Sequence, residues 1–239
     1  MKWRMQKALL LDLYDLLYGH YGPQHWWPAK TPFEVMVGAI LTQGVAWRNV
    51  EVAIARLEAA HLLTPRAVYA AAEDELAEHI RSTLYYRAKA RKLKSMAGLL
   101  VEQWEGELSH FFARPTAVVR RDLLGVWGIG PETADAMLLY AGGHPVFVVD
   151  LYTRRIFSRL GWITGRESYG ELQEAVQSAL GADVQLYNEY HALLDRLAKD
   201  TCRARRPLCS RCPVALSSTL ACPAIPVDSR SPTRPHPAR

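Results

Sequence analysis

The sequence contains only four cysteines and places all of them after residue 201. A secreted domain that depends on disulfides distributes its cysteines along the chain, so this distribution argues against a disulfide framework. No apolar run approaches the ~18 residues of a membrane span. The N-terminal segment has basic residues followed by leucines, as signal peptides do, but Asp12 and Asp15 interrupt the apolar stretch. An amphipathic helix is therefore the better interpretation of this segment.

Strand patterns and internal repeats are also scarce. Alternation of apolar and polar residues is nearly absent, and residues 146–149 are the one candidate strand. The apolar spacing instead predicts an all-α fold of short helices joined by short connectors. Helices are expected over residues 1–20, 32–41, 46–57, 67–80, 87–104, 132–140, 152–160, 168–180 and 184–199.

The composition suits a folded protein with a polyanionic partner. The chain has 239 residues, of which 49% are apolar. That content allows a substantial core in one large domain or two small ones. A net charge of +5 and a pI near 9.1 favour a partner of negative charge.

The stretch LLGVWGIGPETADAMLLYAGGHPVFVVD, residues 123–150, is the most informative part of the chain. Gly128 and Gly130 allow a tight backbone turn, and Pro131 suits the first turn of a new helix. Backbone amides in such a turn can bind a phosphate oxygen. An apolar run then leads to a single carboxylate, Asp150. The simpler interpretation is a helix C-cap, a buried strand and a surface aspartate.

This ordered pattern resembles the helix-hairpin-helix signature of the endonuclease III superfamily of DNA glycosylases, and the resemblance covers about residues 20–222. It implies a two-domain fold with an iron–sulfur loop. One domain, 24–144, is a helical barrel with the hairpin, and the other joins 1–23 to 145–225. Residues 226–239 are expected to be a disordered tail. The resemblance also implies a monomer that acts on double-stranded DNA containing damaged bases. The absence of a targeting segment leaves the cytoplasm as the default location, at the nucleoid if the chain is bacterial.

Asp150 and Glu132 are the expected catalytic residues. Cleavage of an N-glycosidic bond builds positive charge on the sugar, and a nearby carboxylate stabilises that charge or deprotonates the attacking water. In the resembled family this acid lies eighteen residues beyond the variable position of the hairpin, which here is Glu132. Family members that also cut the backbone carry a lysine there to form a Schiff base, which a carboxylate cannot do. AP-lyase activity is therefore not expected. Asp150 also suits a helix N-cap, and Glu132 suits the first turn of a helix.

Five residues are expected to contact DNA by the same resemblance. Gln43 matches a glutamine that fills the space left by the extruded base. Tyr85 matches the position of a side chain that wedges into the opposite strand. Base flipping costs a few kcal/mol of stacking, which makes a plug and a wedge reasonable. Taken alone, neither residue is specific, and a surface glutamine and a half-buried tyrosine would be the better interpretation. The others are Gly128 and Gly130 of the hairpin and Lys199, which matches a DNA-facing or structural residue.

Three tryptophans suggest the substrate. Trp26 and Trp27 precede Pro28, and Trp47 follows Gln43 by four residues. This resembles the 3-methyladenine DNA glycosylase branch, which pairs a Trp-Trp-Pro loop with an aromatic residue beyond a Leu-Thr-Gln. Alkylated purines are electron-poor or cationic, and indoles attract such rings through cation–π interaction. The alternative is that these tryptophans serve the core or hold loops in place.

The cysteines Cys202, Cys209, Cys212 and Cys222 form a C-x6-C-x2-C-x9-C pattern. It resembles the family's [4Fe–4S] loop, whose usual last spacing is x5, so the position of Cys222 as the fourth ligand is the open point. Zinc bound by four thiolates is the alternative, although only one C-x2-C is present.

The resulting expectation is a monofunctional glycosylase for alkylated purines such as 3-methyladenine. An endonuclease III-like enzyme for oxidised pyrimidines is the second possibility, and a non-catalytic module that binds damaged DNA is the third.

The basic run from Arg87 to Lys94 is interpreted as a solvated helix face, and the histidines show no ligand spacing.

Overall fold

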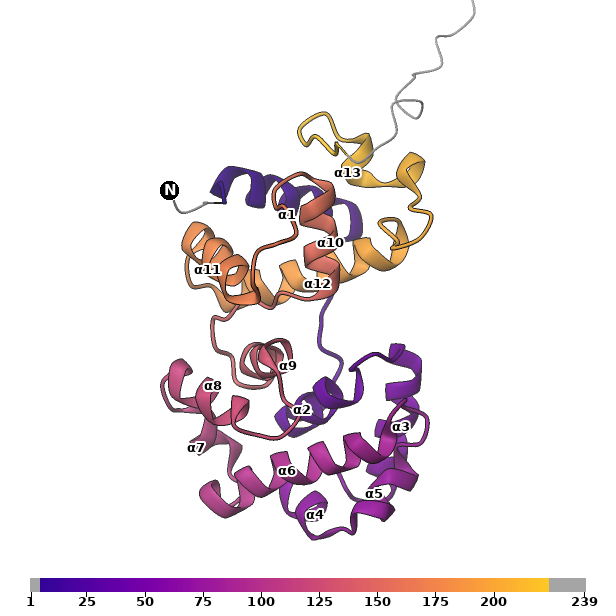
Figure 1. Ribbon diagram of the computed structural model, residues 1–239, viewed down its shortest axis with the longest axis vertical. Coiled ribbons are helices and arrows are strands. Elements are labelled where there is room, and N and C mark those ends of the chain that lie inside the picture. Colours follow the sequence, from indigo (N-terminus) through magenta and orange to yellow (C-terminus); the bar gives the residue numbers. More distant parts are fainter. Residues whose placement is uncertain (1–4, 224–239) are drawn as a thin grey trace, which may run out of the picture. The chain divides into compact units, whose positions relative to one another are not determined.

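The computed structural model describes residues 5–223 of the chain (Figure 1), and within that range every regular element is a helix. This confirms the all-α class.

The chain divides into two compact units, one made of residues 27–148 and one that joins the residues up to Trp26 with those from Val149. The expected boundaries were 24 and 145. The expected tail, 226–239, lies outside the described residues. No helix among residues 5–223 has the length and apolarity needed to cross a membrane.

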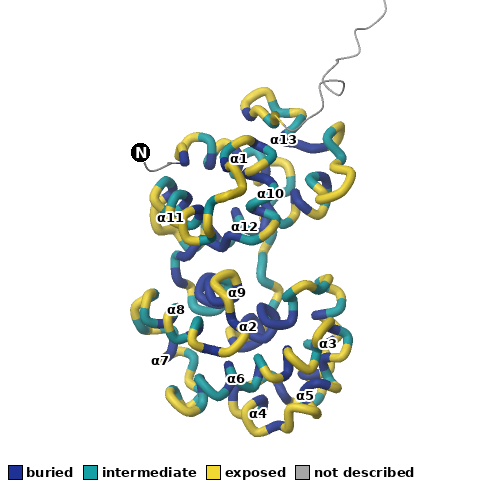
Figure 2. Tube along the Cα trace, viewed as in Figure 1, coloured by how far each residue is buried: buried dark blue, intermediate teal, exposed yellow. Residues whose placement is uncertain are grey.

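The first unit, residues 27–148, is organised around α2. Every residue of this helix except Pro32 is buried, and all of the buried residues except Glu34 are apolar or glycine. The other helices of the unit pack around the same core, which appears dark in Figure 2. The elements are α2 (Pro32–Leu41), α3 (Trp47–Ala59), α4 (Pro65–Ala70), α5 (Glu73–His79), α6 (Tyr86–Trp104), α7 (Leu108–Phe112), α8 (Thr116–Leu124), α9 (Pro131–Ala136) and the π-helical turn η1 (Met137–Ala141).

The second unit is built on the packing of α12 against α1 and α10. Its core includes Phe157, Tyr187 and Tyr190, and the hydroxyl of Tyr190 donates to the Leu10 carbonyl at 2.8 Å, which joins α12 to α1. The elements are α1 (Lys7–Tyr21), α10 (Leu151–Arg159), α11 (Tyr169–Leu180), α12 (Val184–Asp200), the 3₁₀ turn η2 (Cys209–Arg211) and α13 (Pro213–Leu216).

Local capping explains where many helices begin. Thr31, Thr64 and Asp183 each accept a hydrogen bond from a backbone N–H in the first turn of the following helix. Ser168 and Glu171 form a capping box at the start of α11. Such caps satisfy N–H groups that have no partner within the helix.

The expected single helix over 67–80 is wrong, because the chain forms α4 and α5 with a break at Ala71 and Ala72. Both residues have extended backbone, although neither residue type favours a break. The reason lies on α6, where the Lys94 ammonium donates to the carbonyls of Tyr69 (2.5 Å) and Ala71 (2.6 Å). These long-range bonds satisfy carbonyls that the helix would otherwise use. No local pattern could have indicated this.

Residues 146–149 do not form the expected strand. They are buried but form neither helix nor strand, and no strand partner exists among the described residues. Their apolar character therefore reflects burial in a connecting segment, which an apolar run alone cannot distinguish from a strand.

A buried ion pair joins the two helices of the hairpin. The Arg120 guanidinium on α8 donates to both carboxylate oxygens of Asp135 on α9, at 2.6 and 3.1 Å. The Asp135 side chain is completely buried, whereas that of Arg120 is 30% exposed. Bidentate pairs of this kind fix the geometry of both partners.

Replacing Arg120 by methionine is expected to lower the free energy of unfolding by about 3 kcal/mol, because a fully buried carboxylate loses two charge-assisted bonds. Urea denaturation measures the change. Arg121→Met on the same helix is the matched control, since Arg121 pairs with Asp122 at the surface and should contribute less than about 1 kcal/mol. Equal losses in the two variants would contradict the importance of the buried pair.

Candidate active site

The hairpin turn lies between α8 and α9 and has a left-handed residue at Gly128, with φ of +81°. The aliphatic stem of Lys92 on α6 lies against this glycine, because a Cβ at Gly128 would approach the Lys92 Cε to 2.5 Å. Both the backbone conformation and the close contact therefore require glycine. Gly130 has ordinary extended backbone, and a Cβ there would meet no atom within 4 Å. The turn at Gly130 is thus open to an approaching ligand.

Gln43 follows α2 and is bonded to two elements of the same unit. Its amide oxygen accepts from the Lys92 ammonium at 2.5 Å, and its amide nitrogen donates to the Thr133 hydroxyl at 2.9 Å. Thr133 lies in the first turn of α9, next to Glu132. The structure therefore brings the expected plug residue to the hairpin. Glu132 itself is exposed in that first turn.

The basic run on α6 is not simply a solvated face, as the sequence suggested. Lys89 is only 2% exposed and donates to the Leu41 carbonyl at 2.8 Å, at the end of α2. Burial, and then the charge of Lys92, lower the pKa of Lys89 from 10.5 to about 8. A sequence signal existed, because Lys89 shares the helical spacing of the buried Leu93 and Met96.

Tyr85 precedes α6, and 80% of its surface is exposed. Its backbone is left-handed, with φ of 55°, which is rare for a bulky residue. Exposed apolar rings in sparsely populated conformations are typical of binding positions.

Asp150 caps α10 in the second unit. Its Oδ1 accepts from the Thr153 backbone N–H at 2.7 Å, so the N-cap interpretation is correct. Its Oδ2 lies 3.7 Å from Nε2 of His191 on α12, and the side chains of Asp150 and His191 are 15% and 13% exposed. The carboxylate is therefore held in a fixed orientation within a largely enclosed position. His191 was not singled out from the sequence, since a lone histidine has no recognisable spacing.

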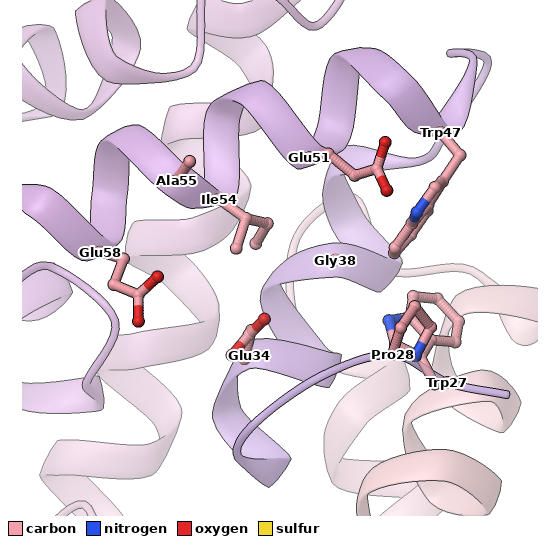
Figure 3. Close-up of a pocket in the computed structure, with 9 residues that line it drawn as sticks. All are labelled: Trp27, Pro28, Glu34, Gly38, Trp47, Glu51, Ile54, Ala55 and Glu58. Carbon is pink, nitrogen blue, oxygen red and sulfur yellow. The ribbon is translucent and has the colours of Figure 1, made fainter. Parts of the chain in front are cut away.

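Trp27 and Trp47 line a cavity of about 170 Å³ in the first unit (Figure 3). Their rings meet edge to face with centroids 5.5 Å apart, and the Tyr140 ring lies 5.3 Å from Trp27. The rest of the lining includes three carboxylates, those of Glu34, Glu51 and Glu58. In Figure 3 the Glu51 carboxylate points toward the Trp47 indole. Glu58 pairs with the Lys30 ammonium. The indoles and the other two carboxylates favour a flat ligand of positive charge.

Trp26 lines a different cavity, which belongs to the second unit and has a volume of about 460 Å³. Lys199 lines the same cavity and lies 5.9 Å above the Trp26 ring. The Lys199 ammonium also forms an ion pair with Asp195 at 2.7 Å. The adjacent tryptophans 26 and 27 thus belong to different units, and the structure groups Trp26 with Lys199 rather than with Trp47.

The four cysteines follow α12, and none is joined in a disulfide. Arg159 of α10 contacts two of them, since its guanidinium lies 3.2 Å from the Cys202 sulfur and its carbonyl lies 3.6 Å from the Cys222 sulfur. Cys209 is the first residue of the 3₁₀ turn η2, and Cys212 follows its last residue. Within residues 5–223 no three His, Cys, Asp or Glu side chains are close enough together to hold a metal ion. The four sulfurs fit an iron–sulfur cluster by donor chemistry. They are not gathered at one point.

The sequence pattern of the HhH-GPD superfamily base excision DNA repair proteins matches residues 37–181, which is more than half of the chain. The chain belongs to this superfamily. It is accordingly a DNA repair glycosylase of the HhH-GPD family, which confirms the resemblance found in the sequence.

Curated relatives agree with this assignment. A Methanocaldococcus jannaschii protein named provisionally as a DNA repair glycosylase is 42% identical over 207 residues, which cover 86% of this chain and 94% of the relative. The endonuclease III of Thermotoga maritima is 28% identical over 181 residues, which cover 76% of this chain and 79% of that enzyme.

Solved structures show the same fold. A non-covalent endonuclease III–DNA complex superposes with a TM-score of 0.74 at 24% identity and covers 87% of this chain and 93% of that one. The H. pylori 3-methyladenine DNA glycosylase bound to 1,N6-ethenoadenine has a TM-score of 0.71 at 29% identity and covers 82% and 98%, respectively.

The lowered pKa of Lys89 predicts a pH dependence of stability. Between about pH 8 and 10.5 the unfolded chain holds a proton at this lysine that the folded protein has released, so stability rises with pH in this window. The rise should amount to roughly 2–3 kcal/mol and should be absent from Lys89→Met.

Urea denaturation at a series of pH values measures this difference. Lys94→Met removes the same charge from the same helix but leaves Lys89 in place, so this control should keep the rise. An identical pH profile in Lys89→Met and the wild type would contradict a lowered pKa of Lys89 in the folded protein.

Proposed function

We propose that this protein is a monofunctional DNA glycosylase that removes alkylated purines, such as 3-methyladenine, from double-stranded DNA. It acts as a monomer in the compartment that contains the DNA, which in a bacterium is the cytoplasm at the nucleoid. The damaged base is flipped out of the helix, and its N-glycosidic bond is hydrolysed without cleavage of the backbone.

Asp150 is the proposed catalytic carboxylate. Bond cleavage leaves positive charge on the sugar, and a fixed carboxylate stabilises it or takes a proton from the attacking water. Two contacts support this role, because the Thr153 N–H holds one carboxylate oxygen and His191 lies near the other. Such pre-orientation avoids reorganisation during the reaction.

Glu132 supports a monofunctional reaction. A Schiff base with the sugar needs an amine, and this position offers a carboxylate in the first turn of α9. Lys199 has an amine, but its ion pair with Asp195 favours a role as a fixed cation. We therefore assign Lys199 to DNA binding.

The observation that carries the substrate assignment is the Trp27–Trp47 pair and its acidic surroundings. An alkylated purine is a flat, cationic or electron-poor ring, which stacks favourably on indoles and is attracted by carboxylates. A cationic base is also a good leaving group and needs little acid catalysis. We propose that the flipped base stacks on this pair. The assignment of Trp26 to the base pocket stays a prediction from the sequence.

DNA binding is assigned to the hairpin and to two side chains of the same unit. Gly128 and Gly130 present backbone amides to a phosphate. Gln43 fills the space of the extruded base, and the exposed Tyr85 ring wedges into the opposite strand.

We further propose that Cys202, Cys209, Cys212 and Cys222 hold a [4Fe–4S] cluster, which would cross-link the loop through four thiolates. The N–H groups of Arg159 near Cys202 would help to stabilise thiolate charge. Zinc remains the second candidate, because four thiolates also suit a tetrahedral site.

Removal of oxidised pyrimidines is the alternative activity, and the relatives named endonuclease III favour it. A panel of duplexes distinguishes the two activities. It contains 3-methyladenine and an oxidised pyrimidine. Duplexes with 8-oxoguanine and with mispaired thymine are added, because proteins of similar fold are named 8-oxoguanine glycosylase and thymine-DNA glycosylase. Release of 3-methyladenine is expected, with no adduct after borohydride reduction. Release of oxidised pyrimidines alone, or a trapped enzyme–DNA adduct, would contradict the proposal.

Asp150→Asn is the matched variant for this panel. Asparagine also caps helices well, so the fold should persist while the charge is lost. Excision should fall at least about 100-fold with DNA affinity retained. Unchanged excision would exclude a catalytic role of the Asp150 carboxylate. A wild type that binds but excises nothing would support a non-catalytic module.

The cluster predicts a brown protein with about four irons per chain and broad absorption near ~400 nm. Cys212→Ser should remove the colour and the iron. A colourless wild type that contains one zinc per chain would establish the alternative.

A further inference from the structure

The Gln43 amide has a hydrogen-bond partner at each end, and both partners lie in the first unit. Its amide oxygen accepts from Lys92 at 2.5 Å, and its amide nitrogen donates to Thr133 at 2.9 Å. An amide oxygen has two lone pairs and an NH₂ group has two hydrogens. After these two contacts, the amide can therefore still accept one hydrogen bond and donate one.

The two partners of Gln43 differ in what they can specify. A hydroxyl both donates and accepts, so Thr133 can pair with either end of the amide. A lysine ammonium only donates, so only the amide oxygen can face it. Lys92 alone therefore determines which end of the Gln43 amide points in which direction.

Lys92 is itself held in place. Its stem lies against Gly128, where a side chain would displace it. One turn earlier on α6, Lys89 donates to the carbonyl of Leu41, two residues before Gln43. Hydrogen bonds from α6 thus hold both the backbone near Gln43 and the Gln43 side chain. Long side chains that are already fixed lose little further conformational freedom on binding.

We propose that Lys92 is a specificity-determining positioning residue that sets the orientation of the Gln43 amide toward the base opposite the extruded nucleotide. Because Lys92 fixes the amide oxygen, the remaining acceptor of the amide always lies on one side and the remaining donor on the other, so that base faces the same pattern in every complex. Bases that offer the complementary donor and acceptor pattern bind well, and the others leave an unpaired group. This inference rests on the proposed role of Gln43 as the residue that fills the DNA helix.

The experiment measures the affinity of the purified protein for short duplexes with one tetrahydrofuran abasic analogue opposite dA, dC, dG or dT. This probe needs no knowledge of the lesion and no catalysis. The wild type should show a spread of about tenfold or more between the best and worst opposite base. Lys92→Met, which has no donor, and Lys92→Gln, which can donate or accept, should reduce that spread to about twofold or less.

Lys92→Arg should retain the spread, because guanidinium only donates. Lys94→Met, with the same charge change on the same helix but no contact with Gln43, should retain it as well. A merely structural or electrostatic role of Lys92 would weaken binding opposite all four bases equally. Comparison of the arginine and glutamine variants remains decisive if the methionine variant folds poorly.

Two outcomes overturn the inference while leaving the proposed function intact. One is a wild-type spread that Gln43→Ala abolishes but Lys92→Gln preserves, and the other is equal wild-type affinity opposite all four bases. Failure of the proposed function is distinct. It would be seen as no preference for the abasic duplex over undamaged DNA. A spread that survives Gln43→Ala would contradict the role of Gln43 and, with it, the inference.

Discussion

The pairing of Arg120 with Asp135 is the constraint on which the hairpin depends. Because the Asp135 carboxylate is fully buried, its two bonds to the guanidinium hold α8 and α9 in one arrangement. The turn between these helices contains Gly128, and the first turn of α9 contains Thr133. Thr133 in turn helps to fix the Gln43 amide. A buried ion pair thus determines the position of groups proposed to contact DNA.

Helix α6 shows that a count of positive charges overstates the charge available to a polyanion. Lys89 donates to the end of α2, Lys92 donates to Gln43, and Lys94 donates to the end of α4. Their stems cover apolar surface while their ammonium groups satisfy carbonyl oxygens inside the unit. By contrast, Arg91 lies 4.3 Å from the exposed Trp127 ring of the hairpin turn and keeps its charge at the surface. One helix therefore combines internal hydrogen bonding with an external basic face.

The sequence allowed prediction of the features that depend on local chemistry. The all-α class, most helix limits and the hairpin with Gly128 follow from periodicity, glycine and proline. The N-cap role of Asp150 follows from its place before a helix. The break between α4 and α5 could not be predicted, because it depends on Lys94 from a distant helix. The assignment of Trp26 and Trp27 to different units depends on tertiary structure for the same reason. The proposed roles of the site residues remain predictions.

The π-helical turn η1 places an aromatic ring beside Trp27. A π turn accommodates one residue more than the corresponding α-helical turn, and it contains Tyr140, whose ring approaches Trp27. Loss of one residue from this turn would restore α-helical register and rotate the following residues by about 100°. Tyr140 would then leave the indole. Chain length at this turn thus determines which ring packs against Trp27, and a single-codon deletion would change that packing with every tryptophan unchanged.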